Sequence, residues 1–208
     1  MVYSSCLKLS VDTEFPEPRV LATAVTVLER GGVIAYPTDT NYGIGCGILD
    51  KRAIERVYEL RNLNRDHLLS LVLPDLSDIA RYAIVEHDTY RMMKRYLPGP
   101  YTFILRATPE VPKIFQSKRM TVGIRVPDHA VTLALARVYK RPIVSTSTKI
   151  GDQMLTNAAE IEKSMGHGLD LIIDAGPLPG ADSSVVDLSG PYPIVLREGA
   201  GDVSWVAV

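Results

Sequence analysis

Short apolar runs alternate with amphipathic segments along most of the chain, and this alternation predicts an α/β fold. Strands are expected where runs of strand-forming residues are bounded by Gly, Pro or polar residues. These runs cover residues 1–10, 33–36, 68–73, 101–105, 121–126, 142–144, 169–174, 183–188 and 194–196. Helical spacing of apolar residues predicts helices at 18–30, 50–63, 75–82, 88–96, 131–139 and 157–165, and a short helical turn at 111–116.

Residues typical of helix ends support three of these helices. Asp50 is a candidate N-cap for the helix at 50–63, and Asn157 or Thr156 for the helix at 157–165. Pro18 suits a first helical turn, and the glycines after residue 30 suit a helix end.

The stretch from Gly31 to Gly47 joins a buried-looking strand to a dense polar turn. Pro37 ends the apolar run because it cannot donate a ladder hydrogen bond, and Thr-Asp-Thr-Asn-Tyr follows at residues 38–42. Hydroxyls at a strand end predict a ligand site, since α/β sheets bind ligands there. A turn between two strands, with its hydroxyls bonded to the backbone, explains the same residues. The spacing leaves both interpretations open.

Polar or basic groups follow other predicted elements. Arg61, Arg65 and His67 come at the end of the helix at 50–63, as partners of its dipole or as an anion site. Arg125 ends a strand just before Val-Pro, which suits capture of a carboxylate or phosphate, or an ion pair at the rim. Residues 145–149, Ser-Thr-Ser-Thr-Lys, favour a polar ligand pocket over a simple turn. Strand ends gathered at one edge of the sheet would place these groups around one pocket.

Composition narrows the classes of protein that fit. The 208 residues predict a single domain over 1–208, and a net charge of −1 excludes a global attraction to polyanions. Two cysteines without metal spacing indicate a reducing compartment. The N-terminus lacks the pattern of a signal peptide, and no apolar run approaches the roughly 18 residues of a membrane span. We therefore expect a soluble, cytoplasmic protein without membrane contact.

Motifs of other chemistries are missing from the sequence. It has no P-loop, nucleophile-elbow or dinucleotide-binding pattern, and its four histidines lack metal-ligand spacing. No catalytic residue and no metal ligand are therefore assigned. A pocket of hydroxyls and cations is suited to positioning and charge stabilisation, which transfer chemistry on a phosphoanhydride requires.

Six segments, in this order and spacing, closely resemble the YrdC/YciO family: GGVIAYPTDTNYGIGC, LPGPYTFIL, TVGIRVPDH, PIVSTST, SSVVDL and PIVLREGAG. The resemblance covers the chain from about Pro18 to Asp202. It implies a YrdC-like α/β fold, in which a twisted, mixed sheet flanked by helices surrounds a large concave cavity with a positive lining.

The resemblance also implies an activity, the synthesis of threonylcarbamoyl-AMP from L-threonine, bicarbonate and ATP with release of pyrophosphate. ATP enters with Mg²⁺, no tightly bound prosthetic group is needed, and the product feeds N6-threonylcarbamoyladenosine formation in tRNA. Some members are linked to double-stranded RNA, so the alternative is an RNA- or nucleotide-binding protein without efficient synthase activity. Basic residues for such binding are Lys94, Arg95, Lys113, Lys118 and Arg119. A scattered, solvated face explains them equally well.

Roles follow residue by residue from the resemblance. Thr40, Arg125, Ser145 and Ser183 match positions around the amino-acid substrate, and Arg125 would hold its carboxylate. The predicted nucleotide-binding residues are Arg61, His67, Thr121, Ser147, Lys149 and Arg197.

One segment departs from the synthases, which usually show Lys-x-Arg-x-x-x-Lys after the second helix. Here that segment runs from Arg61 to His67, with Leu63 at the central arginine position. The usual Ser-Ala-Asn is Ser-Thr-Lys149. Both changes are similar to the YciO branch, and the loss of two cations predicts weaker transition-state stabilisation.

Overall fold

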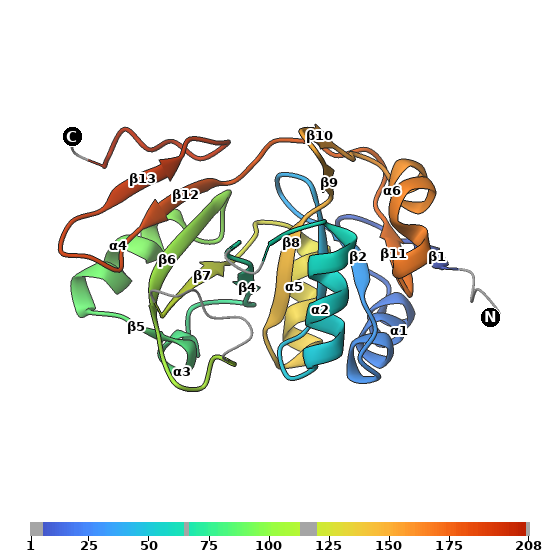
Figure 1. Cartoon of the computed structure of the whole chain (residues 1–208), viewed down its shortest axis with the longest axis horizontal. Helices are drawn as coiled ribbons and strands as arrows, with labels where there is room; N and C mark the ends of the chain where they lie inside the picture. The colour runs from blue at the N-terminus through green and yellow to red at the C-terminus, as the bar shows by residue number, and fades with distance from the viewer. Residues whose placement is uncertain (1–5, 65–66, 113–119, 207–208) are drawn as a thin grey trace.

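The computed structural model describes residues 6–64, 67–112 and 120–206. Its strands are β1 (Leu7–Ser10), β2 (Ile34–Pro37), β3 (Tyr42–Gly47), β4 (Ser70–Val72), β5 (Ala83–Ile84), β6 (Tyr101–Ala107), β7 (Thr121–Arg125), β8 (Ile143–Ser147), β9 (Lys149–Ile150), β10 (Gln153–Met154), β11 (Leu171–Asp174), β12 (Ser184–Asp187) and β13 (Ile194–Arg197). Within the described residues, one large sheet has the order β1-β11-β2-β3-β8-β4-β7-β6-β12-β13, with β5 paired to β6 (Figure 1). Strands β9 and β10 form a separate ribbon.

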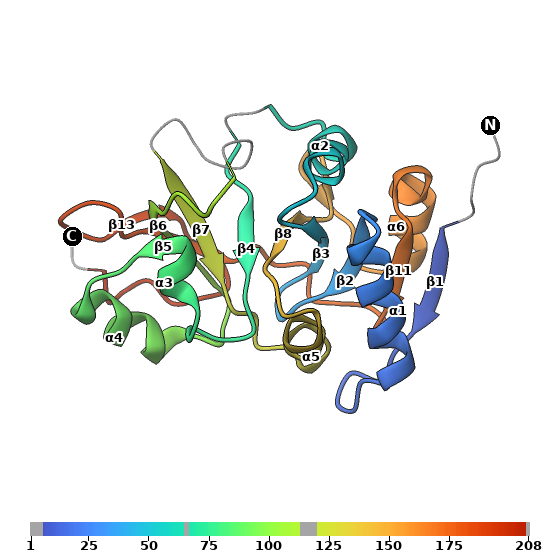
Figure 2. The same ribbon diagram turned by 90° about the horizontal axis from the view of Figure 1, so that it is seen from below.

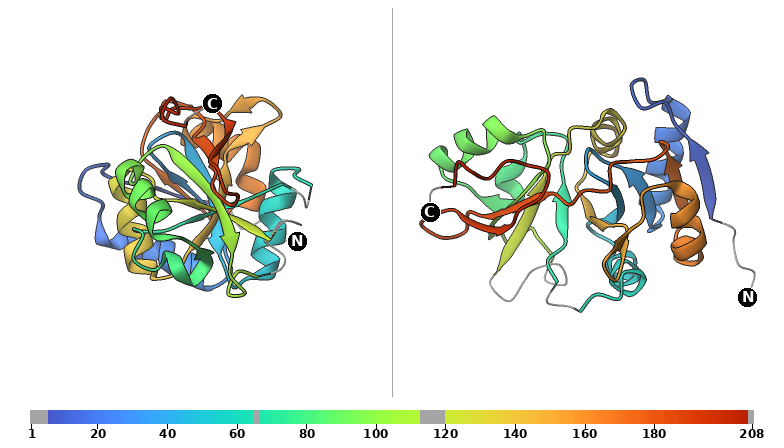
Figure 3. Two further views of the ribbon diagram at one scale, coloured as in Figure 1. Left: turned by 90° about the vertical axis from the view of Figure 1, so that its left-hand side faces the viewer. Right: turned by 90° about the horizontal axis from the view of Figure 1, so that it is seen from above.

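Helices cover both faces of this sheet. They are α1 (Pro18–Glu29), α2 (Lys51–Leu60), α3 (Ile79–Tyr82), α4 (His87–Tyr96), α5 (Ala130–Tyr139) and α6 (Ala158–Met165), with a 3₁₀ turn at Gly166–Gly168. Helices α2 and α6 lie on the opposite side of the sheet from α1 and α5 (Figures 2 and 3), and the buried residues of α3 and α4 belong to the same core cluster as those of α2 and α6. Parallel pairs such as β11–β2 occur beside antiparallel pairs such as β2–β3. The predicted α/β fold with a mixed, twisted sheet is therefore confirmed.

The central strand β2 contributes to the packing on both faces. Ile34 and Tyr36 belong to the core cluster with α1 and α5, whereas Ala35 and the preceding Val33 belong to the cluster with α2. All four residues are fully buried. Burial on both faces explains why this strand reads as a continuous apolar run rather than as an alternating one.

The helix ends agree with the predicted caps, with two corrections to helix length. Asp50 accepts a hydrogen bond from the backbone N–H of Ala53, and Asn157 accepts one from that of Glu160. Helix α2 ends at Leu60 because Asn62 adopts a left-handed φ of 47° and the Leu63 N–H bonds back to Tyr58 O at 2.9 Å.

The helix predicted at 75–82 is reduced to α3. Its first residues form a turn in which Asp75 accepts a hydrogen bond from the Ser77 N–H at 2.7 Å. An aspartate that bonds the backbone two residues ahead favours a turn over a helix.

Strand β3 is missing from the sequence prediction because its glycines mask the pattern of a strand. The ring of Tyr36 lies against this strand: a Cβ on Gly43 would be 3.1 Å from its Cζ, and one on Gly45 would be 3.0 Å from its Cε1. Any side chain at these positions would displace the tyrosine. The glycines therefore let a buried aromatic ring cross the strand.

Strand β8 is longer than predicted. It continues to Ser147, so Ser145 and Ser147 are strand residues that pair with Gly45 and Gly43, and they do not belong to a loop after the strand. The turn predicted at 111–116 extends beyond the described residues at 113, and Lys113, Lys118 and Arg119 also lie outside them. In the described ranges, no helix has the length and apolar character needed to cross a membrane.

Candidate functional site

A cavity of about 450 Å³ lies over β8, β4, β7 and β6. Small residues on neighbouring strands form its floor: Ser145 is paired with Ser70, and Ser70 with Gly123. A Cβ on Gly123 would be 3.2 Å from Thr102 Cγ2 and 3.4 Å from Ser70 Cβ, so the floor has little room for larger residues. The space for a ligand therefore follows from small side chains at matched positions of adjacent strands.

Most of the predicted site residues come together around this cavity from distant parts of the chain. Those that line it are Arg61, His67, Arg125, Ser145, Ser147, Lys149, Ser183 and Arg197. Thr40 is buried beside Arg125, and Thr121 lies at the opposite end of β7 from Arg125. Neither is among the described residues that line the cavity. The individual ligand roles remain predictions.

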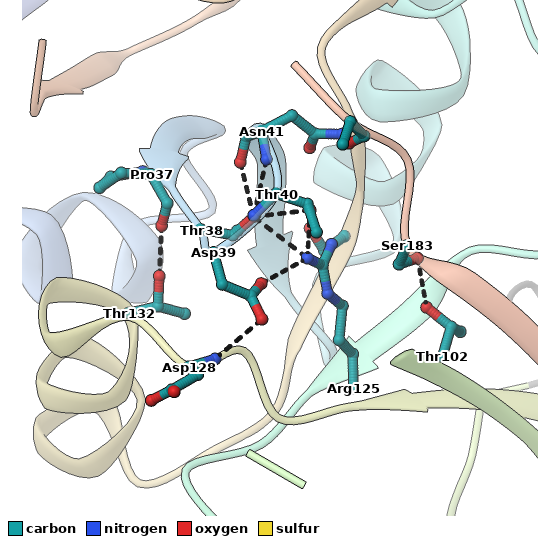
Figure 4. Close-up of polar contacts among 12 residues, drawn as sticks. Pro37, Thr38, Asp39, Thr40, Asn41, Thr102, Arg125, Asp128, Thr132 and Ser183 are labelled. Carbon is teal, nitrogen blue, oxygen red and sulfur yellow. Dashed lines mark hydrogen bonds and ion pairs between the residues drawn. The ribbon is translucent and has the colours of Figure 1, made fainter. Parts of the chain in front are cut away.

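Arg125 is held in place by the polar turn between β2 and β3 (Figure 4). Its Nη2 donates to Asp39 Oδ1 at 2.8 Å, to Thr38 Oγ1 at 3.2 Å and to the hydroxyl of Thr40. The second carboxylate oxygen of Asp39 accepts the Asp128 N–H at 3.1 Å. The Arg125 and Asp39 side chains are only 11% and 9% exposed, so this is a buried ion pair and not a contact at the rim.

The same turn is confirmed as a connection between two strands, and the ligand-site interpretation stays a prediction. It joins two strands and uses a hydroxyl on the backbone, since Thr38 Oγ1 donates to Asn41 O at 2.6 Å. It also positions the guanidinium at the cavity wall. One terminal nitrogen of Arg125, Nη2, makes all three bonds described above. The Nε of Arg125 is buried without a partner among the described residues. Arg125 therefore keeps hydrogen-bonding capacity for an anion.

A second group of charges, around Asp182, lines the same cavity. Asp182 Oδ2 is 3.7 Å from Lys149 Nζ, and its Oδ1 is 3.6 Å from Arg197 Nη1. Burial lowers the pKa of Arg61, and the charge of Asp182 opposes that shift. His67 also lines the cavity. Desolvation, followed by the charges of Arg61 and Arg197, lowers its pKa, so it is neutral at pH 7.

Two of the predicted serines are already bonded within the site. Ser183 Oγ is 2.9 Å from Thr102 Oγ1, and Arg197 donates to both its hydroxyl and its carbonyl, at 3.1 and 2.9 Å. Ser145 Oγ accepts from the Tyr36 hydroxyl at 2.6 Å. Burial raises the pKa of Tyr36 to about 12, so that hydroxyl stays a donor.

Several polar residues at the cavity were not assigned from the sequence, among them Asn41, Ser70, Thr102 and Asp182. Asn41 stood in the sequence within the polar turn. Ser70 interrupts an apolar run, which is only a weak sequence signal for a cavity position. Asp182 stands in a loop with no local pattern that predicts a cavity position. Among the described residues, no group of three or more His, Cys, Asp or Glu side chains could hold a metal ion.

Comparison with known proteins agrees with this architecture. Residues 26–199 match the Sua5/YciO/YrdC family model, which carries the description telomere recombination. The chain belongs to this family. Escherichia coli K12 YciO is 41% identical over 191 residues, which cover 90% of this chain and 93% of YciO. The crystal structure of E. coli YciO has a TM-score of 0.94 at 38% identity, over 97% of this chain and 100% of that one.

Threonylcarbamoyl-AMP synthases are more distant relatives. The mouse enzyme is 33% identical over 178 residues, which cover 82% of this chain and 63% of the enzyme. The structure of Pyrococcus abyssi Sua5 in complex with L-threonine has a TM-score of 0.87 at 30% identity, over 93% of this chain and 57% of Sua5. This chain thus spans less than two thirds of either protein. The predicted similarity to the YciO branch of the family is confirmed.

Proposed function

We propose that this protein is a nucleotidyltransferase similar to threonylcarbamoyl-AMP synthases. It would convert L-threonine, bicarbonate and ATP to threonylcarbamoyl-AMP and pyrophosphate, in the cytoplasm, for modification of tRNA. Family membership supports the reaction class, and the L-threonine complex of Sua5 supports the amino acid.

The observation that carries the proposal is the presence of two different cation sites in one cavity. One is Arg125, a fixed fork donor that is held by Asp39 and the threonines of the polar turn. The other is a looser group, in which Lys149 and Arg197 lie near Asp182 and Arg61 feels its charge. A fixed fork suits a carboxylate, and several adjustable cations suit a chain of phosphates that carries Mg²⁺.

The chemistry then needs orientation and charge stabilisation from the protein. The amine of the amino acid attacks bicarbonate, with loss of water, to give a carbamate. A carbamate oxygen attacks the α-phosphorus, the bond from that phosphorus to the bridging oxygen breaks, and pyrophosphate leaves with the electron pair. Cations around the leaving phosphates stabilise the charge that develops on them.

The test is pyrophosphate release with ATP, Mg²⁺ and bicarbonate, measured separately with each of the twenty amino acids. We expect release that depends on bicarbonate and is greatest with L-threonine. Arg125→Lys serves as a matched variant, since it keeps the charge but loses the fork geometry, and it should weaken the dependence on the amino acid. Release that is equal with and without amino acid would contradict the proposal.

The second candidate, binding of double-stranded RNA or tRNA, has less support. Lys94 and Arg95 are exposed on α4, and the other basic residues proposed for RNA lie outside the described residues. Binding through phosphates would weaken with salt, with a slope of about −0.9 per contact for duplex DNA. Measured RNA affinity that does not change with salt would exclude this candidate.

A further inference from the structure

Asn41 carries a buried hydrogen-bond acceptor to which none of the described groups donates. Its side chain is 1% exposed, and its Oδ1 has no hydrogen-bond partner within the described part of the chain. The residue also belongs to the cavity wall. Buried polar atoms in folded proteins are nearly always bonded, so an unpaired acceptor at a ligand cavity points to a partner on the ligand.

The orientation of the Asn41 amide is fixed by a neighbouring carbonyl. Its Nδ2 donates to Ala181 O at 2.7 Å. Rotation of the amide by half a turn would bring two oxygens together, so the group left over is the oxygen. The backbone of Asn41 is held as well, because its carbonyl accepts the Thr38 N–H at 3.0 Å and the Thr38 hydroxyl at 2.6 Å. The acceptor is thus preorganised.

The turn that positions this acceptor also positions Arg125 (Figure 4). Thr38 bonds to Asn41 on one side and to Arg125 Nη2 on the other. The subsite therefore combines donors for an anion with one fixed acceptor. A ligand that matches both carries a carboxylate and, a few bonds away, an N–H or O–H group.

We propose that Asn41 Oδ1 accepts a hydrogen bond from a donor group of the carboxylate ligand held by Arg125. Asn41 thereby selects amino or hydroxy acids over plain carboxylates. This inference rests on the proposed function and names the part of the substrate that the protein recognises. In L-threonine the donor is the amino nitrogen, which keeps an N–H in the carbamate, or the side-chain hydroxyl.

The experiment compares two variants of the full chain that both lose the hydrogen bond from residue 41 to the Ala181 carbonyl. Asn41→Leu and Asn41→Asp both lose the donor to the Ala181 carbonyl, but Asn41→Asp keeps an acceptor. Calorimetry measures the affinity of each protein for L-threonine and for butyrate, which has the carboxylate without either donor. We expect the preference for L-threonine over butyrate to fall about 10-fold in Asn41→Leu and to be retained in Asn41→Asp.

Two further ligands identify the donor. L-2-aminobutyrate lacks the hydroxyl, and 3-hydroxybutyrate lacks the amine. The ligand whose affinity falls in Asn41→Leu as that of L-threonine does carries the group that Asn41 binds. An equal preference in the natural protein and in Asn41→Leu would overturn this inference and leave the proposed function standing. Failure of L-threonine to bind the natural protein would overturn both.

Discussion

Replacement of Arg125 tests the site most directly, and the structure changes the expected result. The sequence predicts that Arg125→Ala abolishes binding and leaves the fold intact. In the structure, however, Arg125 and Asp39 form a buried pair at 2.8 Å. Removing one member of such a pair leaves an uncompensated charge in the interior. The expected loss of unfolding free energy is about 3–5 kcal/mol, a large part of the stability of a small protein.

A double-mutant cycle separates this loss from the loss of binding. The single variants are Arg125→Met and Asp39→Asn, which preserve most of the volume, and the double variant carries both changes. Since the double variant contains no buried charge at this pair, it should recover most of the stability. We expect a coupling energy near the upper end of the usual range, about 3 kcal/mol.

Urea unfolding gives the stability of the four proteins, and calorimetry gives their affinity for L-threonine. Both variants without Arg125 should bind L-threonine roughly 10- to 150-fold more weakly, which corresponds to about 1.5–3 kcal/mol for a charge-assisted hydrogen bond. Asp39→Asn keeps the guanidinium and should bind better than either. A double variant as unstable as the sum of the single variants would refute the pairing argument, and unchanged affinity in Arg125→Met would refute the carboxylate site.

Three further changes probe the rest of the site and the fold. The double variant Leu63→Arg, His67→Lys should raise the rate of pyrophosphate release about 10-fold or more if missing cations limit the reaction. Leu63 also packs against the core, so the melting temperature of the variant must be measured beside its rate. A stable variant with an unchanged rate would show that other groups limit the reaction. Asp182→Asn should tighten binding of a non-hydrolysable ATP analogue about 10-fold by freeing its two cationic partners, whereas weaker binding would show that Asp182 holds them in place. Burial lowers the pKa of His129 below its ordinary 6.5, so the unfolded chain binds the proton more readily and the unfolding free energy should fall as pH drops below about 6.5. In His129→Asn this slope, measured by urea unfolding at several pH values, should be smaller, and an identical slope would contradict the argument.

Most of the strands and helices could be predicted because apolar periodicity and end caps are local signals. Asp50 and Asn157 cap the helices as expected. Prediction failed where packing against another strand decides the conformation. Strand β3 exists because its glycines accommodate the ring of Tyr36, and β8 extends through two serines because β3 pairs with it. Neither relation is visible within a window of neighbouring residues.

The candidate site shows the same limit. Arg125 could be assigned from its motif, but its buried partner Asp39 stood in the sequence as one more polar residue of a turn. The proposed role of Asn41 depends on the carbonyl of Ala181, which is far away along the chain. This carbonyl accepts the hydrogen bond of the Asn41 Nδ2 and leaves Oδ1 unpaired. Residues whose function depends on what the fold leaves unpaired require the structure.

On the proposed function, the two groups of charges around the cavity would favour different parts of the substrates. Beside Arg125 the guanidinium is offset by Asp39 at 2.8 Å, so a ligand there meets directed hydrogen bonds with little net charge. In the second group Lys149 and Arg197 share the Asp182 carboxylate at 3.7 and 3.6 Å, and Arg61 adds a third cation. Since attraction grows with the charge of the ligand, a polyphosphate would gain most from these three cations, and a singly charged carboxylate would depend on the directed hydrogen bonds of Arg125.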